Sequence, residues 1–169
     1  MSPSQVDLAV SELTDTVTGC SSGLGESLAR AIYQAGHCIV ATARNVESLS
    51  YLPDDKDPER NPTVLKLALD VTSPESIDNA IKESLAYFQK IDVFINNAGY
   101  GLLGEMEAIP EPEARRLMET NFWGPVNITK AALQLFRETK GQFTTKTIVQ
   151  VTSMGGWITA PGHSFYHAR

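Results

Sequence analysis

A glycine-rich segment near the start of the chain has the composition of a phosphate-binding loop. It runs from Thr18 to Gly25 as Thr-Gly-Cys-Ser-Ser-Gly-Leu-Gly and stands between an apolar stretch and a helical pattern. Glycines permit a tight turn and close approach of the backbone to a diphosphate, and the first N–H groups of the following helix favour an anion. In this strand–turn–helix setting the segment predicts a phosphate site, the alternative being a purely structural turn.

The elements that would position this loop alternate between apolar strands and amphipathic helices. Five apolar stretches predict strands, at residues 11–17, 37–42, 64–69, 91–95 and 147–151. Helical periodicity covers residues 23–35, 74–88 and 111–139, with a break near Gly124-Pro125, and Pro53–Pro62 is predicted to be a loop. This alternation predicts an α/β fold of the Rossmann-like type, a doubly wound parallel sheet in a three-layer α/β/α arrangement.

The composition fits one globular domain and disfavours several other classes. The 169 residues carry a net charge of −6, and 42% of them are hydrophobic. An acidic chain without a basic block is a poor nucleic-acid binder, and no apolar run approaches the ~20 residues of a membrane-spanning helix. Cys20 and Cys38 are too few for a zinc site or a disulfide framework, so we predict no metal and two buried thiols in a reducing, cytoplasmic protein.

Further motifs follow the predicted strands in order. Asp70-Val71 follows the third strand, Asn96-Asn97-Ala98-Gly99 follows the fourth, Asn121 lies in the long helical pattern, and Ser153 precedes Tyr166 by 13 positions. Together with the Gly-x-x-x-Gly-x-Gly spacing, these motifs resemble the short-chain dehydrogenase/reductase family. The resemblance implies a single NAD(P)-binding Rossmann domain over residues 1–169, with an irregular segment over about residues 1–13. It also implies a domain that is incomplete at its C-terminal end, because family members are longer.

The resemblance implies which residues contact the cofactor: Gly19, Ser21, Ser22, Gly23, Leu24, Gly25, Arg44, Asp70, Val71, Asn97, Ala98 and Gly99. Arg44 follows the second strand, where NAD-selective enzymes place a carboxylate for the ribose 2′-hydroxyl. A guanidinium suits a 2′-phosphate instead, and Ser21 could add a hydrogen bond. We therefore predict NADP(H) rather than NAD(H), the alternative being that Arg44 only stacks on adenine or is solvated.

In the resembled family a tyrosine is the general acid/base for an alcohol/carbonyl pair, which implies catalytic roles for Tyr166, Ser153 and Asn121. The family lysine would stand at position 170, and Arg169 comes one position too early for it. A four-residue stretch after residue 165 cannot nucleate a helix alone, so Tyr166 is not expected to be held in place. The resemblance also implies pairing of copies through the long helix.

The leading hypothesis is therefore an NADP(H)-dependent oxidoreductase that moves hydride between nicotinamide and a small alcohol or carbonyl substrate. A catalytically inactive fragment that binds the cofactor or a partner is the alternative, and the absent lysine favours it for the chain as written. A weaker alternative is another Rossmann-like enzyme such as a methyltransferase.

Two single residues raise local questions. Pro125 has no N–H, so it cannot bond to the carbonyl of Asn121, and we hypothesise that this frees the carbonyl for a proton relay rather than only kinking the helix for packing. Asp15 falls within the first predicted strand, where a buried carboxylate is costly unless it is paired or lies at the strand edge.

Overall fold

The computed structural model describes residues 13–54, 64–139 and 146–168, and its strands and helices alternate as predicted. The strands are β1 (Thr14–Val17), β2 (Cys38–Ala43), β3 (Val64–Ala68), β4 (Val93–Asn96) and β5 (Thr147–Gln150). The helices are α1 (Gly23–Gln34), α2 (Pro74–Phe88), α3 (Glu111–Met118), α4 (Gly124–Glu138) and the single turn α5 (Ser164–His167). Short 3₁₀ turns lie at Val46–Leu49 and Met154–Gly156.

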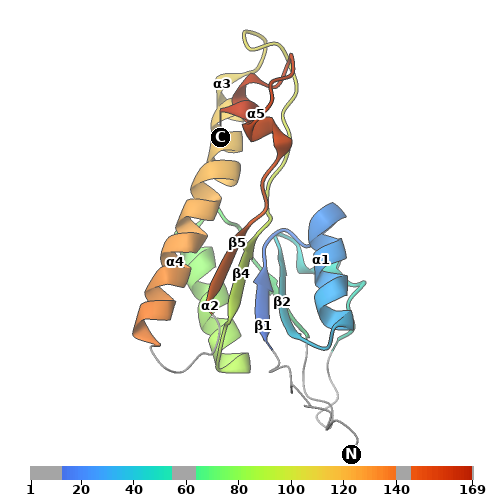
Figure 1. Ribbon diagram of the computed structural model, residues 1–169, viewed down its shortest axis with the longest axis vertical. Helices are drawn as coiled ribbons and strands as arrows, with labels where there is room; N and C mark the ends of the chain where they lie inside the picture. The colour runs from blue at the N-terminus through green and yellow to red at the C-terminus, as the bar shows by residue number, and fades with distance from the viewer. Residues whose placement is uncertain (1–12, 55–63, 140–145, 169) are drawn as a thin grey trace, which may run out of the picture.

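The five strands form one parallel sheet in the order β3-β2-β1-β4-β5. Figure 1 shows α1 on one face of this sheet and α2 with α4 on the other, while α3 and α5 lie beyond its upper end. The order is that of a doubly wound sheet, in which the chain leaves β1 first to one side and then to the other. The predicted Rossmann-like, three-layer fold is confirmed.

The strand register brings the predicted site loops to one end of the sheet. Val17, the last residue of β1, pairs with Ala41 of β2 and Ile95 of β4, so the three strands end at nearly the same level. In open parallel sheets the loops beyond these carboxyl ends form the ligand site. The glycine-rich loop, Arg44 and the segment after Asn96 therefore leave the sheet side by side.

Two hydrophobic clusters hold the helices against the sheet. Phe94 and Val40 face α2 and α4, where the Phe94 ring packs edge-on against Phe136 with centroids 5.8 Å apart. Ile39 and Val17 belong to the cluster on the α1 face. Cys20 and Cys38 are buried thiols outside any disulfide among the described residues, as predicted.

The long helical pattern is divided in a way that periodicity did not show. Residues Glu119–Trp123 form a π-helical turn between α3 and α4, and the N–H of Gly124 bonds five residues back to the carbonyl of Glu119. The predicted break near Gly124-Pro125 thus lies just after the irregular turn. The described helices include none that is long and apolar enough to cross a bilayer.

Parts of three expectations lie outside the described residues. These are most of the irregular N-terminal segment, the larger part of the Pro53–Pro62 loop, and Arg169.

Asp15 occupies the central strand of the sheet and is only 7% exposed. Burial raises the pKa of the Asp15 carboxyl, the nearby carboxylate of Asp92 raises it further, and His37 opposes both effects. Folding therefore favours the protonated form of this carboxyl more than the unfolded chain does. The folded state holds this proton to higher pH than the unfolded chain, so stability falls as pH rises above the ordinary carboxyl range.

Replacing this carboxyl by an isosteric apolar group should stabilise the protein. We expect Asp15→Val to raise the free energy of unfolding at neutral pH by about 1–3 kcal/mol, because no charge then has to be buried. The gain should shrink at acidic pH, where Asp15 is protonated. Urea unfolding at both pH values measures it, with exposed Asp78→Val as the control, and a destabilised Asp15→Val protein at neutral pH would contradict the interpretation.

Candidate active site

The glycine-rich loop turns from β1 into α1 through positions that exclude side chains. Gly19 has φ of +72°, and an added Cβ there would lie 2.8 Å from the Cα of Ala98. A Cβ on Gly25 would lie 2.2 Å from the carbonyl oxygen of Gly19 and 2.5 Å from Nδ2 of Asn97. The loop backbone is thus packed tightly enough that only glycine fits, while the first N–H groups of α1 have no acceptor within their own helix.

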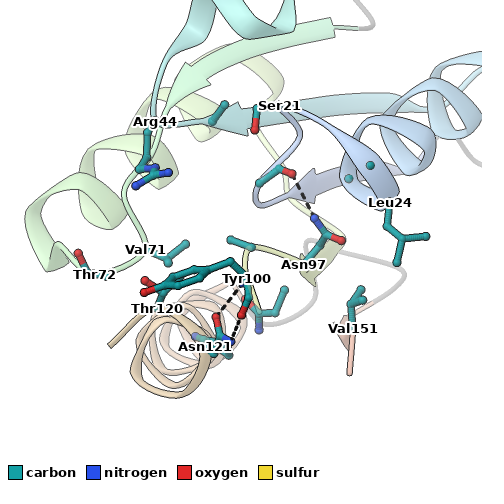
Figure 2. Close-up of a pocket in the computed structure, with 18 of the residues that line it drawn as sticks. Ser21, Leu24, Arg44, Val71, Thr72, Asn97, Tyr100, Thr120, Asn121 and Val151 are labelled. Carbon is teal, nitrogen blue, oxygen red and sulfur yellow. Dashed lines mark hydrogen bonds between the residues drawn. The ribbon is translucent and has the colours of Figure 1, made fainter. Parts of the chain in front are cut away.

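Thr18 ties this loop to the one that follows β4. Its Oγ1 accepts hydrogen bonds from the backbone N–H groups of Asn97 (3.0 Å) and Ala98 (2.9 Å). In return, Nδ2 of Asn97 donates to the carbonyls of Thr18 (2.9 Å) and Gly19 (3.2 Å), as Figure 2 shows in part. The sequence analysis gave Thr18 no role, and its one local signal is a hydroxyl placed between a strand and Gly19.

Three further bonds support the loop from the β2 side. The Thr42 hydroxyl donates to the carbonyl of Val17 (2.9 Å), and the carbonyl of Thr42 accepts from the N–H of Cys20 (2.8 Å). The Tyr51 hydroxyl donates to the carbonyl of Cys20 (2.9 Å). Burial raises the pKa of the Cys20 thiol to about 11, so this cysteine is a neutral part of the scaffold at physiological pH.

One cleft of about 1020 Å³ collects the predicted contact residues at the carboxyl end of the sheet. Every predicted site residue lines it except Ser153, whose neighbours Val151 and Thr152 do so. The lining also includes residues that the sequence analysis did not assign to the site: Ala43, Leu69, Thr72, Asn96, Tyr100, Gly101, Arg116, Glu119, Thr120, Pro125, Val151 and Thr152. These residues come from several separate segments of the chain, so the fold brings them together and no local sequence pattern shows their proximity.

Arg44 and Val71 mark one end of the cleft. Figure 2 shows Arg44 projecting from the end of β2 toward the side where Val71 and Thr72 lie, with Ser21 on the neighbouring loop. Val71 is buried, and Gly124 allows α4 to approach it, because a Cβ on Gly124 would lie 2.7 Å from Cγ2 of Val71. This end therefore combines an exposed cation with an apolar floor.

Asp70 has the turn role that the sequence left open, and it also faces the cleft. Its Oδ1 accepts from the N–H (2.9 Å) and the hydroxyl (2.7 Å) of Thr72, which fixes the turn into α2. The N–H of Asp70 donates to Oγ of Ser76 (3.0 Å). One carboxylate oxygen is thus engaged within the turn.

Asn121 lies in the π-helical turn and holds the segment after β4 with its side chain. Its Oδ1 accepts from the N–H of Tyr100 (3.0 Å), and its Nδ2 donates to the carbonyl of Tyr100 (2.7 Å), as drawn in Figure 2. Because Pro125 lacks an N–H, it gives the Asn121 carbonyl no helical partner from that position. The sequence analysis missed Tyr100, whose only signal is its position directly after Asn96-Asn97-Ala98-Gly99.

The segment after β5 brings Ser153 and Tyr166 together at Gly155. Oγ of Ser153 accepts from the N–H of Gly155 (3.1 Å). A Cβ built on Gly155 would lie 3.0 Å from Cε1 of Tyr166 and 3.5 Å from Oγ of Ser153, so both groups border the same point. The two residues are 13 positions apart, and their proximity is produced by the intervening loop.

The expectation that Tyr166 is not held in place is wrong, because α5 packs on other elements. Phe165 lines a groove with Ile109, Met118 and Trp123 on the α3 side. The N–H of Gly104 also donates to the carbonyl of Gly162 (2.8 Å). A single helical turn that could not form alone is stabilised here by these tertiary contacts.

Residues 15–169 match the family model described as short chain dehydrogenase. The chain belongs to the short-chain dehydrogenase/reductase family. Its relatives include oxidoreductase calM of Penicillium decumbens, which is 45% identical over 156 residues, or 90% of this chain and 49% of that protein. The chain spans about half the length of the curated relatives it matches.

Solved structures agree with this assignment. The 3-ketoacyl-(acyl-carrier-protein) reductase of Brucella melitensis, complexed with NADH, superposes with a TM-score of 0.82 at 25% identity, covering 92% of this chain and 63% of its own. The alcohol dehydrogenase of the archaeon Thermococcus sibiricus, complexed with 5-hydroxy-NADP, has a TM-score of 0.80 at 29% identity, with 93% and 65% covered. The family therefore includes members bound to either type of nicotinamide cofactor.

The Thr18 hydroxyl can be tested by a matched pair of substitutions. Thr18→Val keeps the shape but leaves the N–H groups of Asn97 and Ala98 without an acceptor, which should lower the free energy of unfolding by about 2–3 kcal/mol. Thr18→Ser keeps the acceptor and should cost much less. Urea unfolding measures both, and equal stability of the two variants would show that the hydroxyl is not what joins the loops.

Proposed function

We propose that this chain forms the NADP(H)-binding and reacting part of an oxidoreductase that interconverts an alcohol and a carbonyl group on a small-molecule substrate. The observation that carries the proposal is one cleft lined by the side-chain-excluding glycine loop, by Arg44 and by Tyr166. A Cβ at Gly19 or Gly25 would meet Ala98 or Asn97, so these glycines permit the tight turn that leads the loop into α1, whose first N–H groups suit a diphosphate.

The residues present fit each part of the cofactor. The N–H groups at the start of α1 suit the diphosphate, and Asp70 with Val71 suits the adenine. Arg44 and Ser21 suit a 2′-phosphate, because an exposed guanidinium offers paired donors to phosphate oxygens. When bound, NADP(H) supplies or accepts the hydride.

Arg44 supports NADP(H) over NAD(H) because neither neighbouring position carries a carboxylate for a ribose 2′-hydroxyl. Ala43 precedes Arg44, and the side-chain oxygen of Asn45 already accepts from the N–H of Glu47 (3.0 Å) to cap the short turn that follows β2. A carboxylate at either position would instead repel a 2′-phosphate.

Ser153 and Tyr166 supply the groups for proton transfer in this proposal. Since Oγ of Ser153 accepts from the N–H of Gly155, its own hydrogen is directed elsewhere and can donate to a substrate carbonyl oxygen. The Tyr166 hydroxyl then donates its proton to that oxygen during reduction, and the resulting phenolate takes a proton back from the alcohol during oxidation. Asn121 supports the site by fixing Tyr100 and offers its backbone carbonyl to a proton relay.

The cofactor assignment predicts a change in nucleotide preference. Arg44→Asp should weaken NADPH binding relative to NADH by about 10- to 100-fold, because a charge-assisted bond is lost and a repulsive charge is introduced. Fluorescence titration of the reduced nucleotides measures both dissociation constants. Arg137→Asp, exposed in the last turn of α4, serves as a charge-matched control, and an unchanged preference in Arg44→Asp would refute the assignment.

The assignment of Tyr166 predicts a separation of binding from turnover. Tyr166→Phe keeps the ring against Gly155 but removes the hydroxyl, so NADPH affinity should hold while carbonyl reduction falls by about 10²- to 10⁴-fold. NADPH oxidation with a panel of aldehydes and ketones measures turnover. Equal turnover of the two proteins would assign the proton donor elsewhere, and binding without turnover by the unmodified chain would favour the inactive alternative.

A further inference from the structure

His167 follows Tyr166 on α5, and its ring joins that turn to the loop after Ser153. Nδ1 of His167 lies 2.6 Å from the carbonyl oxygen of Gly155, and Nε2 lies 3.3 Å from the backbone nitrogen of Ala160. Both partners belong to the loop between Ser153 and α5. One imidazole therefore bridges two points of this loop and the helical turn that carries Tyr166.

The chemistry of the two partners determines which nitrogen carries the proton. A carbonyl oxygen only accepts, so Nδ1 of His167 must donate to Gly155. A backbone N–H only donates, so Nε2 must accept from Ala160. Only the neutral Nδ1–H tautomer satisfies both bonds. In the Nε2–H tautomer, Nδ1 would have no hydrogen to donate to Gly155, and the hydrogen on Nε2 would face the N–H of Ala160. In the imidazolium, the hydrogen on Nε2 would face the same N–H.

Gly155 is the point where this bridge meets the reacting groups. Its N–H donates to Oγ of Ser153, a Cβ added to it would meet the Tyr166 ring, and its carbonyl accepts from His167. The backbone bonds of α5, such as the one from the N–H of His167 to the carbonyl of His163 (2.8 Å), are internal to the turn. They do not reach the loop after Ser153, whereas the His167–Gly155 bond joins α5 to it.

We propose that His167 is a positioning residue, which as the Nδ1–H tautomer holds the Tyr166 ring against Gly155 and so places the Tyr166 hydroxyl relative to Ser153. Its catalytic meaning rests on the proposed function. Its structural content does not, because the two hydrogen bonds and the ring contact are properties of the free chain.

His163 provides a matched control on the same segment. Its ring also lies near Tyr166, with centroids 6.2 Å apart, but its Nδ1 is paired with the carbonyl of Pro161 at 3.2 Å, only two residues away. That local bond does not connect α5 to Gly155. A general effect of removing an imidazole beside Tyr166 would appear in both variants, and a positioning effect only at His167.

The first test is nuclear magnetic resonance on the isotope-labelled chain without ligand. Long-range ¹⁵N–¹H correlations of the imidazole at neutral pH should show His167 as the Nδ1–H tautomer, and the Tyr166 ring protons should show a nuclear Overhauser effect to the Gly155 Hα protons. An Nε2–H tautomer or an imidazolium at neutral pH would overturn the proposal.

Substitutions then separate the two bonds. His167→Asn keeps a donor near the Nδ1 position and should retain the nuclear Overhauser effect between Tyr166 and Gly155. His167→Gln keeps a polar group only near the Nε2 position, so it should lose this effect, as should His167→Ala. His163→Ala should retain it. Core resonances report whether each variant is folded, and an undiminished effect in folded His167→Ala and His167→Gln would overturn the proposal.

Enzyme kinetics test whether the His167–Gly155 bond affects turnover. His167→Ala should lower kcat for NADPH-dependent carbonyl reduction by about 10- to 100-fold with little change in the dissociation constant of NADPH, and His167→Asn should restore most of it. Equal losses in His167→Ala and His163→Ala would overturn the positioning role. If the unmodified chain bound no nucleotide, the proposed function would fail, while the ligand-free spectra would still decide the tautomer and the bridge.

Discussion

The candidate site depends first on the bonds that join the end of β1 to the end of β4. A single buried hydroxyl, that of Thr18, accepts two successive amides from the segment after β4, and the amide of Asn97 returns two bonds to the loop after β1. Just beyond the ends of β1 and β4 there is no strand pairing to satisfy the backbone N–H and C=O groups, and these bonds satisfy them instead. They also bring the two segments so close that Gly19 and Gly25 cannot carry side chains. The same close approach therefore determines both the shape of the loop and the need for glycine at these positions.

Farther from the sheet, the cleft is again held by bonds from side chains to backbone groups. Asn121 bonds both backbone groups of Tyr100, and it can do so because the π-helical turn at Glu119–Trp123 changes the direction of the residues between α3 and α4. Such turns interrupt α-helices at functional positions more often than elsewhere. The segment with Ser153 and Tyr166 is held by the surroundings of Phe165, by the Gly104–Gly162 backbone bond and by the bonds at Gly155. One end of the cleft is therefore formed by the closely packed loop after β1, and the other by segments held through bonds at Tyr100 and Gly155.

This division explains which features the sequence could predict. Periodicity located the helices and strands to within a few residues, because both depend on the local alternation of apolar positions. The cleft followed from topology, since loops at the carboxyl ends of parallel strands must meet. Bonds such as those from Asn97 to Thr18 join residues about 80 positions apart and leave no local pattern. The π-helical turn appeared only as a break, and the packing that holds Phe165 and α5 was missed because a rule for isolated helices was applied to a turn with tertiary partners.

The same division bears on how such a site can change specificity. A substitution at Gly19 or Gly25 alters the backbone path that also joins β1 to β4, so it affects stability and binding together. Arg44, by contrast, is exposed beyond the end of β2, and exchanging it changes the charge facing the cleft without removing core packing. Asp15 shows that the core tolerates a poorly suited group when the surrounding strands are well paired, at a cost in stability rather than in fold. The scaffold thus constrains the path of the glycine-rich loop and leaves the charge beside it free to change.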